Sequence, residues 1–322
     1  KDDATHPYGA AGTSSEGGSR GAGWCACILP HPGRVWALSA RPGGEAAVPL
    51  LASACADGRV RLYHAGEALA GSNTAGGQAE GGAAGTDGPG LCFIRHTLGS
   101  HDGDAYAVVL HPREPLCLSA GYDGTVRLYD LFTGVHLRSL VGHARAVTAA
   151  AFNGAGNLVA SGGKDASIRF WDLRSGLCIK TLGAPLGEVS SVDLAPNGVH
   201  LLSSSRDNAI RIWDVRSTRP LRSLKGHQNT ARNFVRAAFA RGGGLASSGS
   251  EDGAVYLWDV ESGQLAARLP GHSDVVYEAR WCDTLSLLAS ASHDGVVRTW
   301  AHDRSRDAAR LLLEDPWMGA AA

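Results

Sequence analysis

The stretch LVASGGKDASIRFWDLRSG at residues 158–176 decides the fold, because close copies of it recur along the chain. Clear copies are HLLSSSRDNAIRIWDVRS at 200–217, LASSGSEDGAVYLWDVESG at 245–263 and LLASASHDGVVRTWAHD at 287–303. Weaker copies are LCLSAGYDGTVRLYDLFTG at 116–134 and LLASACADGRVRLYHAG at 50–66. A repeat period of roughly 20 to 50 residues is typical of solenoids and propellers. We therefore expect a repeat protein with six recognisable units.

Fixed offsets inside each copy are stricter than the period. The turn aspartates recur about every 42 residues, after a longer first interval, and they are Asp57, Asp123, Asp165, Asp207, Asp252 and Asp294. A serine stands four residues before each aspartate, an aromatic residue six after it, and a histidine usually 22 before it. The fourth unit has Pro185 in place of the histidine. Complete sets are His143, Ser161, Asp165 and Trp171; His227, Ser248, Asp252 and Trp258; and His272, Ser290, Asp294 and Trp300.

Short apolar segments such as SIRFWD and AVYLWD have the character of strands, and Asp-Gly or an equivalent pair is typical of a tight turn between two strands. With these features the six units resemble the WD40 repeat family over about residues 24–303. The resemblance implies an all-β propeller of four-stranded blades. It also implies that histidine, serine, aspartate and tryptophan of one unit form a hydrogen-bonded chain, so that buried hydroxyl and indole groups have partners. Because these sets recur in every blade, whereas a catalytic triad occurs once, we interpret them as structural.

The number of blades stays open between six and seven, with seven slightly favoured. A ring must close, since an open ring leaves strand edges exposed. Residues 24–29, WCACIL, have the pattern of a strand that would complete the last blade of a six-bladed ring. Alternatively, the first 30 and last 22 residues together build a degenerate seventh blade, or a repeat lies upstream of Lys1.

Three segments fall outside the repeat. Residues 1–23, rich in Gly, Ser and Ala, are expected to be a flexible N-terminal segment, and residues 304–322 a C-terminal tail. Residues 65–90 explain the long first interval, and we expect them to be a flexible Gly- and Ala-rich loop inserted between two strands. We expect this loop to act as a tether or as a contact for a partner, or simply to connect the two strands.

Composition argues against several function classes. The formal net charge is -1, which gives no electrostatic reason to expect nucleic acid or an anionic membrane as a partner. We find no transmembrane run, no signal peptide and none of the phosphate-loop, zincin or nucleophile-elbow motifs, so we expect neither membrane insertion, a small-molecule substrate nor enzymatic activity. The seven scattered cysteines suggest reduced thiols of an intracellular protein in the cytoplasm or nucleus. The pair Cys25 and Cys27 has no second pair to complete a metal site, and we expect no metal or cofactor.

A rigid ring leaves its loops free for binding, so the predicted function is a protein–protein interaction scaffold within a multi-protein complex. The residue before each turn aspartate is expected on one face near the channel mouth. The candidates for a partner-binding face are Tyr122, Lys164, Arg206, Glu251 and His293, with Arg145 and Asp274 from neighbouring loops. Their mixed charge suits a short peptide that carries both signs. The plain alternative is that they are solvated turn residues.

The last four units are similar to the WD40 subunit of histone H3 lysine-4 methyltransferase complexes. The similarity rests on a unit without its histidine followed by GHQNTARNFVRAAF, SGSEDGAVYLWD and GHSDVV. That family implies an arginine side chain gripped between two aromatics in the channel. The matching positions are Tyr122 and Arg236. With a cation replacing one aromatic, the expected guest is an acidic or polar peptide.

Two successive units end in Trp-Asp-x-Arg, as WDLR at 171–174 and WDVR at 213–216. This tandem resembles substrate receptors of cullin-4 ubiquitin ligases, in which the arginines face the adaptor. The resemblance implies Arg174 and Arg216 as adaptor-binding residues and gives an alternative function. If Arg174 and Arg216 instead pair with Asp172 and Asp214 of their own motifs, this alternative function is weakened.

Overall fold

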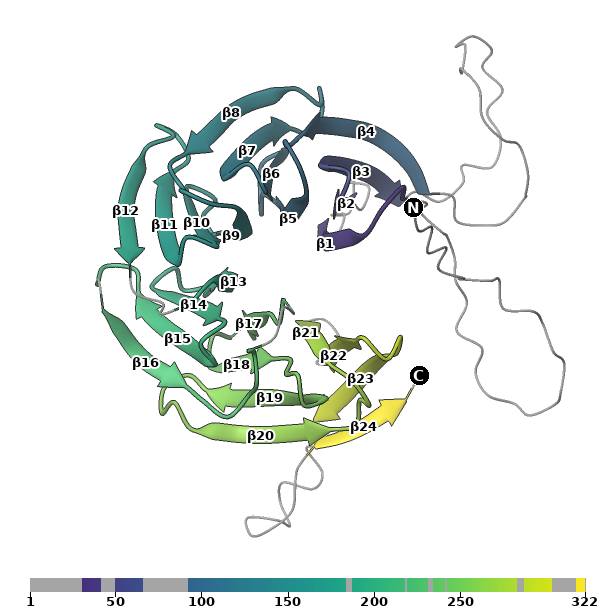
Figure 1. Ribbon diagram of the computed structural model, residues 1–322, viewed down its shortest axis with the longest axis vertical. Coiled ribbons are helices and arrows are strands. Elements are labelled where there is room, and N and C mark those ends of the chain that lie inside the picture. Colours follow the sequence, from purple (N-terminus) through teal and green to yellow (C-terminus); the bar gives the residue numbers. More distant parts are fainter. Residues whose placement is uncertain are drawn as a thin grey trace, which may run out of the picture.

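The chain forms β-sheets that are arranged in a ring around a central axis (Figure 1). The computed structural model describes residues 31–41, 50–65, 92–183, 187–217, 219–230, 234–240, 242–282, 287–302 and 317–321. All regular elements in these residues are β-strands, which confirms the predicted all-β propeller. No helix long and apolar enough to cross a membrane occurs in the described part of the chain.

The strands make six antiparallel four-stranded sheets, which we call blades A to F, each built from four consecutive strands. Blade A consists of β1 (Val35–Arg41), β2 (Leu50–Cys55), β3 (Arg59–Ala65) and β4 (Cys92–Ser100). Blade B consists of β5 (Ala105–Leu110), β6 (Leu116–Gly121), β7 (Thr125–Asp130) and β8 (His136–Val141). Blade C consists of β9 (Val147–Phe152), β10 (Leu158–Gly163), β11 (Ser167–Asp172) and β12 (Cys178–Gly183).

The second half repeats this order. Blade D consists of β13 (Val189–Leu194), β14 (His200–Ser205), β15 (Ala209–Asp214) and β16 (Pro220–Leu224). Blade E consists of β17 (Ala237–Phe239), β18 (Leu245–Ser248), β19 (Ala254–Asp259) and β20 (Leu265–Pro270). Blade F consists of β21 (Val276–Cys282), β22 (Leu287–Ser292), β23 (Val297–His302) and β24 (Trp317–Ala321). The first strand of each blade lies nearest the central axis, and the fourth lies at the rim (Figure 1).

The described residues thus contain six blades, within the six or seven expected, and no seventh sheet is seen among them. The fourth strand of blade F is β24, from the stretch that sequence placed in a C-terminal tail. Strand β24 therefore occupies the fourth position of the last blade, which was one of the positions predicted for residues 24–29. Residues 24–29 lie outside the described residues, as do residues 1–23 and 66–90. Strands β3 and β4, which flank the predicted inserted loop, pair with each other.

Apolar side chains between neighbouring blades hold the ring together. The residue three positions after the turn aspartate is a β-branched aliphatic that packs on the next blade, as Val255 of blade E packs against Ala279 of blade F. Alternation along each strand puts every second side chain on this face. The first strands follow one another in contact from β1 through β5, β9, β13 and β17 to β21. No comparable contact joins β21 back to β1 in the described residues, and the two strands stand apart in Figure 1.

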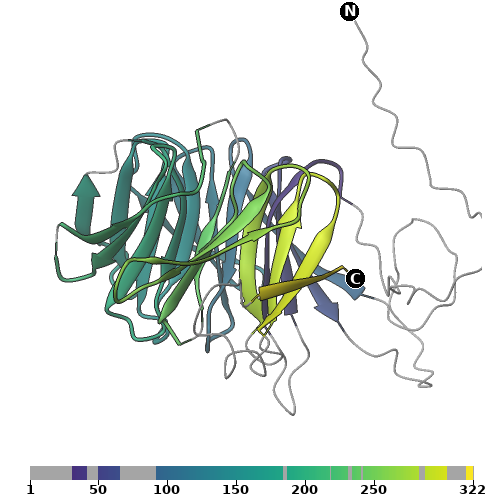
Figure 2. The same cartoon turned by 90° about the horizontal axis from the view of Figure 1, so that it is seen from below.

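The turn between the second and third strands determines which residues lie on one end of the ring. Its third residue has a positive φ in every blade, which favours glycine. Blades C and D place Ala166 and Asn208 there, with φ of 56° and 63°. Figure 2 shows the sheets upright and side by side, so that all these turns lie at one end and the turns after the third strands at the other.

Candidate partner-binding face

The histidine, serine and tryptophan of blades C and F form the hydrogen-bonded chain that the family resemblance implies. In blade C, Nε2 of His143 lies 2.7 Å from Ser161 Oγ, Nδ1 lies 2.9 Å from Asp165, and the Trp171 indole donates to Ser161 at 2.8 Å. In blade F the equivalent separations are 2.8, 2.9 and 2.9 Å, among His272, Ser290, Asp294 and Trp300. The histidine, serine and tryptophan side chains are buried, and the side chains of Asp165 and Asp294 are 9% and 8% exposed, so the sets support the scaffold.

Blade E departs from this expectation. His227 is buried, yet neither of its ring nitrogens has a hydrogen-bond partner among the described residues. Trp258 donates instead to the carbonyl oxygen of Lys225 at 3.1 Å. The predicted set of His227, Ser248, Asp252 and Trp258 is therefore not formed.

Blade E differs from blades C and F in two ways: His227 stands 25 residues before Asp252 instead of 22, and Tyr256 stands where the other five blades have arginine. Its hydroxyl donates to Asp252 Oδ2 at 2.7 Å, and its ring stacks on Trp258 at 5.8 Å between centroids. Asp252 is thus engaged by the tyrosine on its own strand, and also by Arg268.

Burial and hydrogen bonding move the pKa values of these groups. Burial alone would raise the pKa of Asp123, but hydrogen bonds from Thr125 and His101 outweigh it and lower the pKa to about 2. Asp57, hydrogen-bonded by Arg61, also has a pKa of about 2. Burial lowers the pKa of His227 to about 4, and the charges of Asp207, Asp252 and Glu251 offset this effect only in part. At neutral pH the carboxylates are charged and His227 is neutral.

One backbone hydrogen bond recurs in each blade and places the predicted binding residues on one face. The N–H of the residue before the turn aspartate donates to the segment just before the first strand. Examples are Tyr122 to Asp104 at 2.8 Å, Lys164 to Ala146 at 2.8 Å, and His293 to Val275 at 2.8 Å. Arg206 and Glu251 make the same bond, to Glu188 and Gln228. We call this end of the ring the turn face.

Several charged residues of the turn face are in contact with other residues of the chain. Arg206 Nη1 lies 2.8 Å from Glu188 Oε2, and Arg145 approaches the other oxygen of Glu188 at 3.9 Å. His293 lies 2.8 Å from Asp274. In a separate contact, Glu251 accepts a backbone N–H at 3.0 Å from Thr230.

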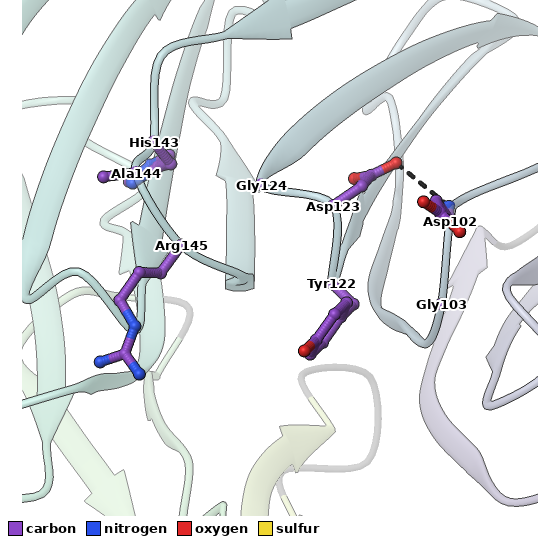
Figure 3. A pocket seen from close by; sticks show the side chains of 8 residues that line it. All are labelled: Asp102, Gly103, Tyr122, Asp123, Gly124, His143, Ala144 and Arg145. Carbon is purple, nitrogen blue, oxygen red and sulfur yellow. Dashed lines mark hydrogen bonds between the residues drawn. The ribbon is translucent and has the colours of Figure 1, made fainter.

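Tyr122 stands out on this face because it is 60% exposed. It borders a pocket of about 320 Å³ lined by Asp102, Gly103, Tyr122, Asp123, Gly124, His143, Ala144 and Arg145 (Figure 3). The ring lies against Gly103, where a Cβ atom would come within 3.0 Å of it. The backbone N–H of Asp102 donates to Asp123 at 3.3 Å and fixes the far wall. The Arg145 side chain, 66% exposed, forms the opposite wall.

An aromatic cluster between the turn face and the channel was not predicted from the sequence. The rings of Trp36, Tyr106 and Phe234 lie 5.4 to 5.7 Å apart between centroids. Lys164 Nζ lies 5.0 Å from the Tyr106 centroid and 5.7 Å from that of Phe234, within range of a cation–π interaction. A sequence signal existed, because Trp36 and Tyr106 each stand five residues after a repeat histidine.

Arg236, matched by sequence to an aromatic of the channel, is held by its own chain. Its Nη2 atom donates to the carbonyl oxygens of Trp36 at 2.9 Å and Tyr106 at 3.3 Å, and Nη1 lies 3.7 Å from Glu278. The guanidinium therefore links the first strands of blades A, B and F.

Arg174 and Arg216 follow the third strands of neighbouring blades C and D, at the end of the ring opposite the turn face. Both are exposed. Their backbone N–H groups donate to Asp172 at 3.4 Å and Asp214 at 2.7 Å, but the described residues place no carboxylate within ion-pair distance of either guanidinium. The two cations are thus presented together to solvent.

A ring of four-stranded blades with a buried histidine–serine–tryptophan chain is a β-propeller. The family description "WD domain, G-beta repeat" matches residues 93–130, 134–172, 176–214, 218–259 and 263–301, more than half of the chain. The chain therefore belongs to the WD40 repeat family, whose propellers are generally non-catalytic and typically mediate protein–protein interactions. Comparison with curated proteins gave no match. In the described residues no group of histidine, cysteine or acidic side chains is arranged to hold a metal ion.

Proposed function

We propose that this protein is a non-catalytic scaffold, a subunit of a multi-protein complex that binds partner peptides on the turn face. The observation that carries the proposal is Tyr122, an aromatic ring 60% exposed at the edge of a pocket of about 320 Å³. Exposed aromatic side chains beside pockets are the usual anchors of protein interfaces. The ring is already fixed against Gly103, so binding orders few additional side-chain rotations.

The lining of the pocket indicates the chemistry of the peptide. Arg145 offers a largely exposed guanidinium on one wall, and Asp102 an exposed carboxylate on the other. A short segment with an acidic and a basic side chain flanking an apolar one would satisfy both walls and cover Tyr122. Such mixed pairing fixes register more than it adds affinity.

The similarity to the WD40 subunit of histone H3 lysine-4 methyltransferase complexes supports a scaffold role but not recognition of an arginine peptide. At the matching position Arg236 is a cation, bonded to Trp36, Tyr106 and Glu278 of its own chain. An incoming arginine would meet like charge instead of an aromatic face.

Two further parts of the proposal rest on composition. The net charge of -1 favours protein partners over direct contact with nucleic acid. The free thiols of Cys55, Cys117 and Cys178 in the described residues favour a reducing compartment, the cytoplasm or the nucleus.

Selection of peptides from a random displayed library tests the turn face. Peptides selected on the wild-type chain should bind Tyr122→Ala at least about tenfold more weakly, the scale of a modest hot spot. The control is Phe132→Ala, because Phe132 is 63% exposed but lies after the third strand of blade B, on the other face. Equal binding to wild type, Tyr122→Ala and Phe132→Ala would remove the turn face from the proposal.

The exposed pair Arg174 and Arg216 favours a second candidate, a substrate receptor of a cullin-4-type ubiquitin ligase. Their guanidinium groups lie on adjacent blades, free of ion pairs in the described residues, as an adaptor-binding pair requires. Purified cullin-4 adaptor should then bind the wild-type chain and lose affinity at least about tenfold with Arg174→Ala plus Arg216→Ala. Arg145→Ala, on the turn face, serves as the matched control. No binding of the adaptor to the wild-type chain would reject this candidate.

A further inference from the structure

Two cations lie on the aromatic cluster of Trp36, Tyr106 and Phe234. Trp36 and Tyr106 belong to β1 and β5, the innermost strands of blades A and B (Figure 1). Arg34 Cζ lies 5.0 Å from the centroid of the Trp36 ring, and Lys164 Nζ lies 5.0 Å from that of Tyr106. Both distances are within the range of a cation–π interaction. We call the three rings, Arg34 and Lys164 the cationic subsite.

Neither cation of the subsite has an anionic partner in the part of the chain that the structure describes. No carboxylate there lies within ion-pair distance of Arg34 or Lys164, and neither side chain donates a hydrogen bond. Arg145 and Arg206 of the turn face, by contrast, share Glu188 at 3.9 and 2.8 Å. Arg34 is exposed and Lys164 partly exposed, so their N–H donors can be reached by an acceptor from another molecule.

The indole N–H of Trp36 is also unpaired. Its Nε1 atom is buried and has no hydrogen-bond partner among the described residues. Most buried polar groups of folded proteins are hydrogen-bonded, and local exceptions are expected at functional sites. The subsite therefore combines two unpaired cations with an unpaired donor.

The carboxylate of Asp104 sets the net charge of the subsite. Burial and the charge of Asp104 both raise the pKa of Tyr106, which stands two residues further along the chain. Asp104 makes no ion pair with either cation in the described residues. Arg236, which also contacts Tyr106, is paired with Glu278 at 3.7 Å. Two cations and one carboxylate leave one net positive charge, which a carboxylate balances and a doubly charged phosphate exceeds.

A positively charged guest is disfavoured at the same place. The rings of Trp36 and Tyr106 each carry a cation of the chain itself, so an incoming ammonium or guanidinium group would meet like charge. An acidic side chain instead gains charge-assisted hydrogen bonds from Arg34 and Lys164. Its methylene groups can pack on the partly exposed rings of Trp36 and Phe234.

We propose that the cationic subsite binds the carboxylate of an aspartate or glutamate side chain in a partner peptide. The inference rests on the proposed function, because it names the chemistry of the peptide where the turn face meets the central axis. The backbone N–H of Tyr122 donates to the carbonyl oxygen of Asp104 at 2.8 Å, two residues before Tyr106. The pocket at Tyr122 and the cationic subsite therefore adjoin, and one peptide spans both.

Bead-bound peptide pools test the inference on the full chain. Each pool contains short peptides with random flanking positions and blocked ends, and the central residue is glutamate, glutamine, lysine or phosphoserine. The wild-type chain should be retained on the glutamate pool at least about tenfold more than on the glutamine or lysine pool. Equal retention on the glutamate and glutamine pools, none on either included, would overturn the inference. Stronger retention on the lysine or phosphoserine pool would do the same.

Variants of the two cations locate the effect. Lys164→Met and Arg34→Met remove the charge but keep an unbranched side chain, so each should reduce the preference for glutamate over glutamine at least about fivefold. Lys164→Arg keeps the charge and should keep the preference, which separates loss of charge from a disturbed fold. The matched control is Lys225→Met, because Lys225 is an exposed cation beside the turn of blade D, without an ion pair in the described residues. A preference that survives in both Lys164→Met and Arg34→Met would contradict the subsite.

A double-mutant cycle measures the contact itself. One peptide selected from the glutamate pool and its glutamine form are each bound to the wild-type chain and to Lys164→Met. Because both changes remove the same contact, the combined loss of affinity should be smaller than the product of the two single losses by at least about fivefold. Losses that multiply would place the carboxylate elsewhere and reject the inference.

Tyr122→Ala separates this inference from the peptide site at Tyr122. The substitution should lower retention on the glutamate and glutamine pools by the same factor. If retention depends on Tyr122 without a preference for glutamate, the peptide site stands and the cationic subsite is rejected. If the preference for glutamate persists and Tyr122→Ala has no effect, the subsite stands and the role of Tyr122 is rejected.

Discussion

The Nη2 atom of Arg236 lies 2.9 Å from the carbonyl oxygen of Trp36, 200 residues away in the chain. Trp36 belongs to β1 of blade A, and Arg236 directly precedes β17 of blade E. The contact therefore crosses the channel beside the opening of the ring and links blades that do not follow one another. It stabilises the open ring where the interblade packing stops.

Replacing this arginine should weaken the ring. Arg236→Met leaves the carbonyl oxygen of Trp36 without its donor and Glu278 with one cation fewer, so we expect a loss of about 1–3 kcal/mol in the free energy of unfolding. Urea denaturation followed by tryptophan fluorescence measures it. Arg280→Met is the control, because Arg280 is 64% exposed and should matter less. A larger loss for Arg280→Met than for Arg236→Met would show that the contact does not stabilise the ring.

The two histidines His227 and His272 should respond in opposite ways to the same substitution. His272→Leu removes the partner of Ser290 and Asp294, and we expect about 2–4 kcal/mol of destabilisation. His227→Leu removes two buried nitrogens that have no partner in the described residues, so stability should be unchanged or rise by about 1 kcal/mol. Thermal and urea unfolding at pH 7 compare them. A large loss for His227→Leu would mean that its ring is hydrogen-bonded in solution.

The free energy of unfolding should depend on pH in a way that reports the protonation of His227. Its pKa is lowered by burial from 6.5 to about 4, so the unfolded chain binds a proton over a range where the folded chain does not. Stability is then fully present above pH 6.5 and falls as the pH drops toward 4, by up to about 3 kcal/mol from this group. His227→Leu lacks this contribution, so its advantage over the wild type should grow from pH 7 to pH 4. Parallel pH profiles would contradict the lowered pKa.

The turn of blade C stores backbone strain that a glycine would relieve. Ala166 has a φ of 56°, a left-handed conformation that disfavours a Cβ atom. Ala166→Gly should stabilise the protein by about 0.5–1 kcal/mol, net of the greater freedom of glycine in the unfolded chain. The reverse change at the equivalent position of blade B, Gly124→Ala, should destabilise it, because the new Cβ would lie 3.1 Å from the Arg145 carbonyl oxygen. Differential scanning calorimetry of the pair shows whether the signs are opposite.

Thiol reactivity should separate interior from surface cysteines. Burial raises the pKa of Cys117 to about 12, which keeps it protonated and unreactive in the folded state. Cys178 is exposed. With iodoacetamide at pH 8, Cys178 should be alkylated at least about 100-fold faster than Cys117, and the difference should vanish in urea. Peptide mass spectrometry follows both sites, and similar native rates would place Cys117 at the surface.

Much of the blade architecture was predictable because it depends on contacts within one repeat. The offsets around each turn aspartate determine the second strand, the tight turn and the third strand, and blades C and F form their hydrogen-bonded chains as predicted. Blade E shows where such reasoning fails. Its serine, aspartate and tryptophan match the pattern, but Asp252 accepts a hydrogen bond from Tyr256 on its own strand, and His227 has no hydrogen-bond partner in the described residues.

The contacts between the first and last blades and the aromatic cluster of Trp36, Tyr106 and Phe234 were not predictable in the same way, because they depend on residues far apart in the chain. Val297 carries the same kind of side chain as the buried Val60 and Val255, and only the position of blade A decides whether it is covered. Trp36, Tyr106 and Phe234 come from three blades and meet only after the ring has formed.

Each described blade is woven from one uninterrupted stretch, with β24 completing blade F from its own end of the chain. In the described residues, therefore, the sheet of blade F contains no strand from the N-terminal end of the chain, and the sheet of blade A contains none from the C-terminal end. Among the same described residues, blades A and F each have a single neighbouring blade. A pulling force on the two ends of the chain would therefore act first on these two blades. Unfolding under such tension would begin at blades A and F and proceed toward the blades between them.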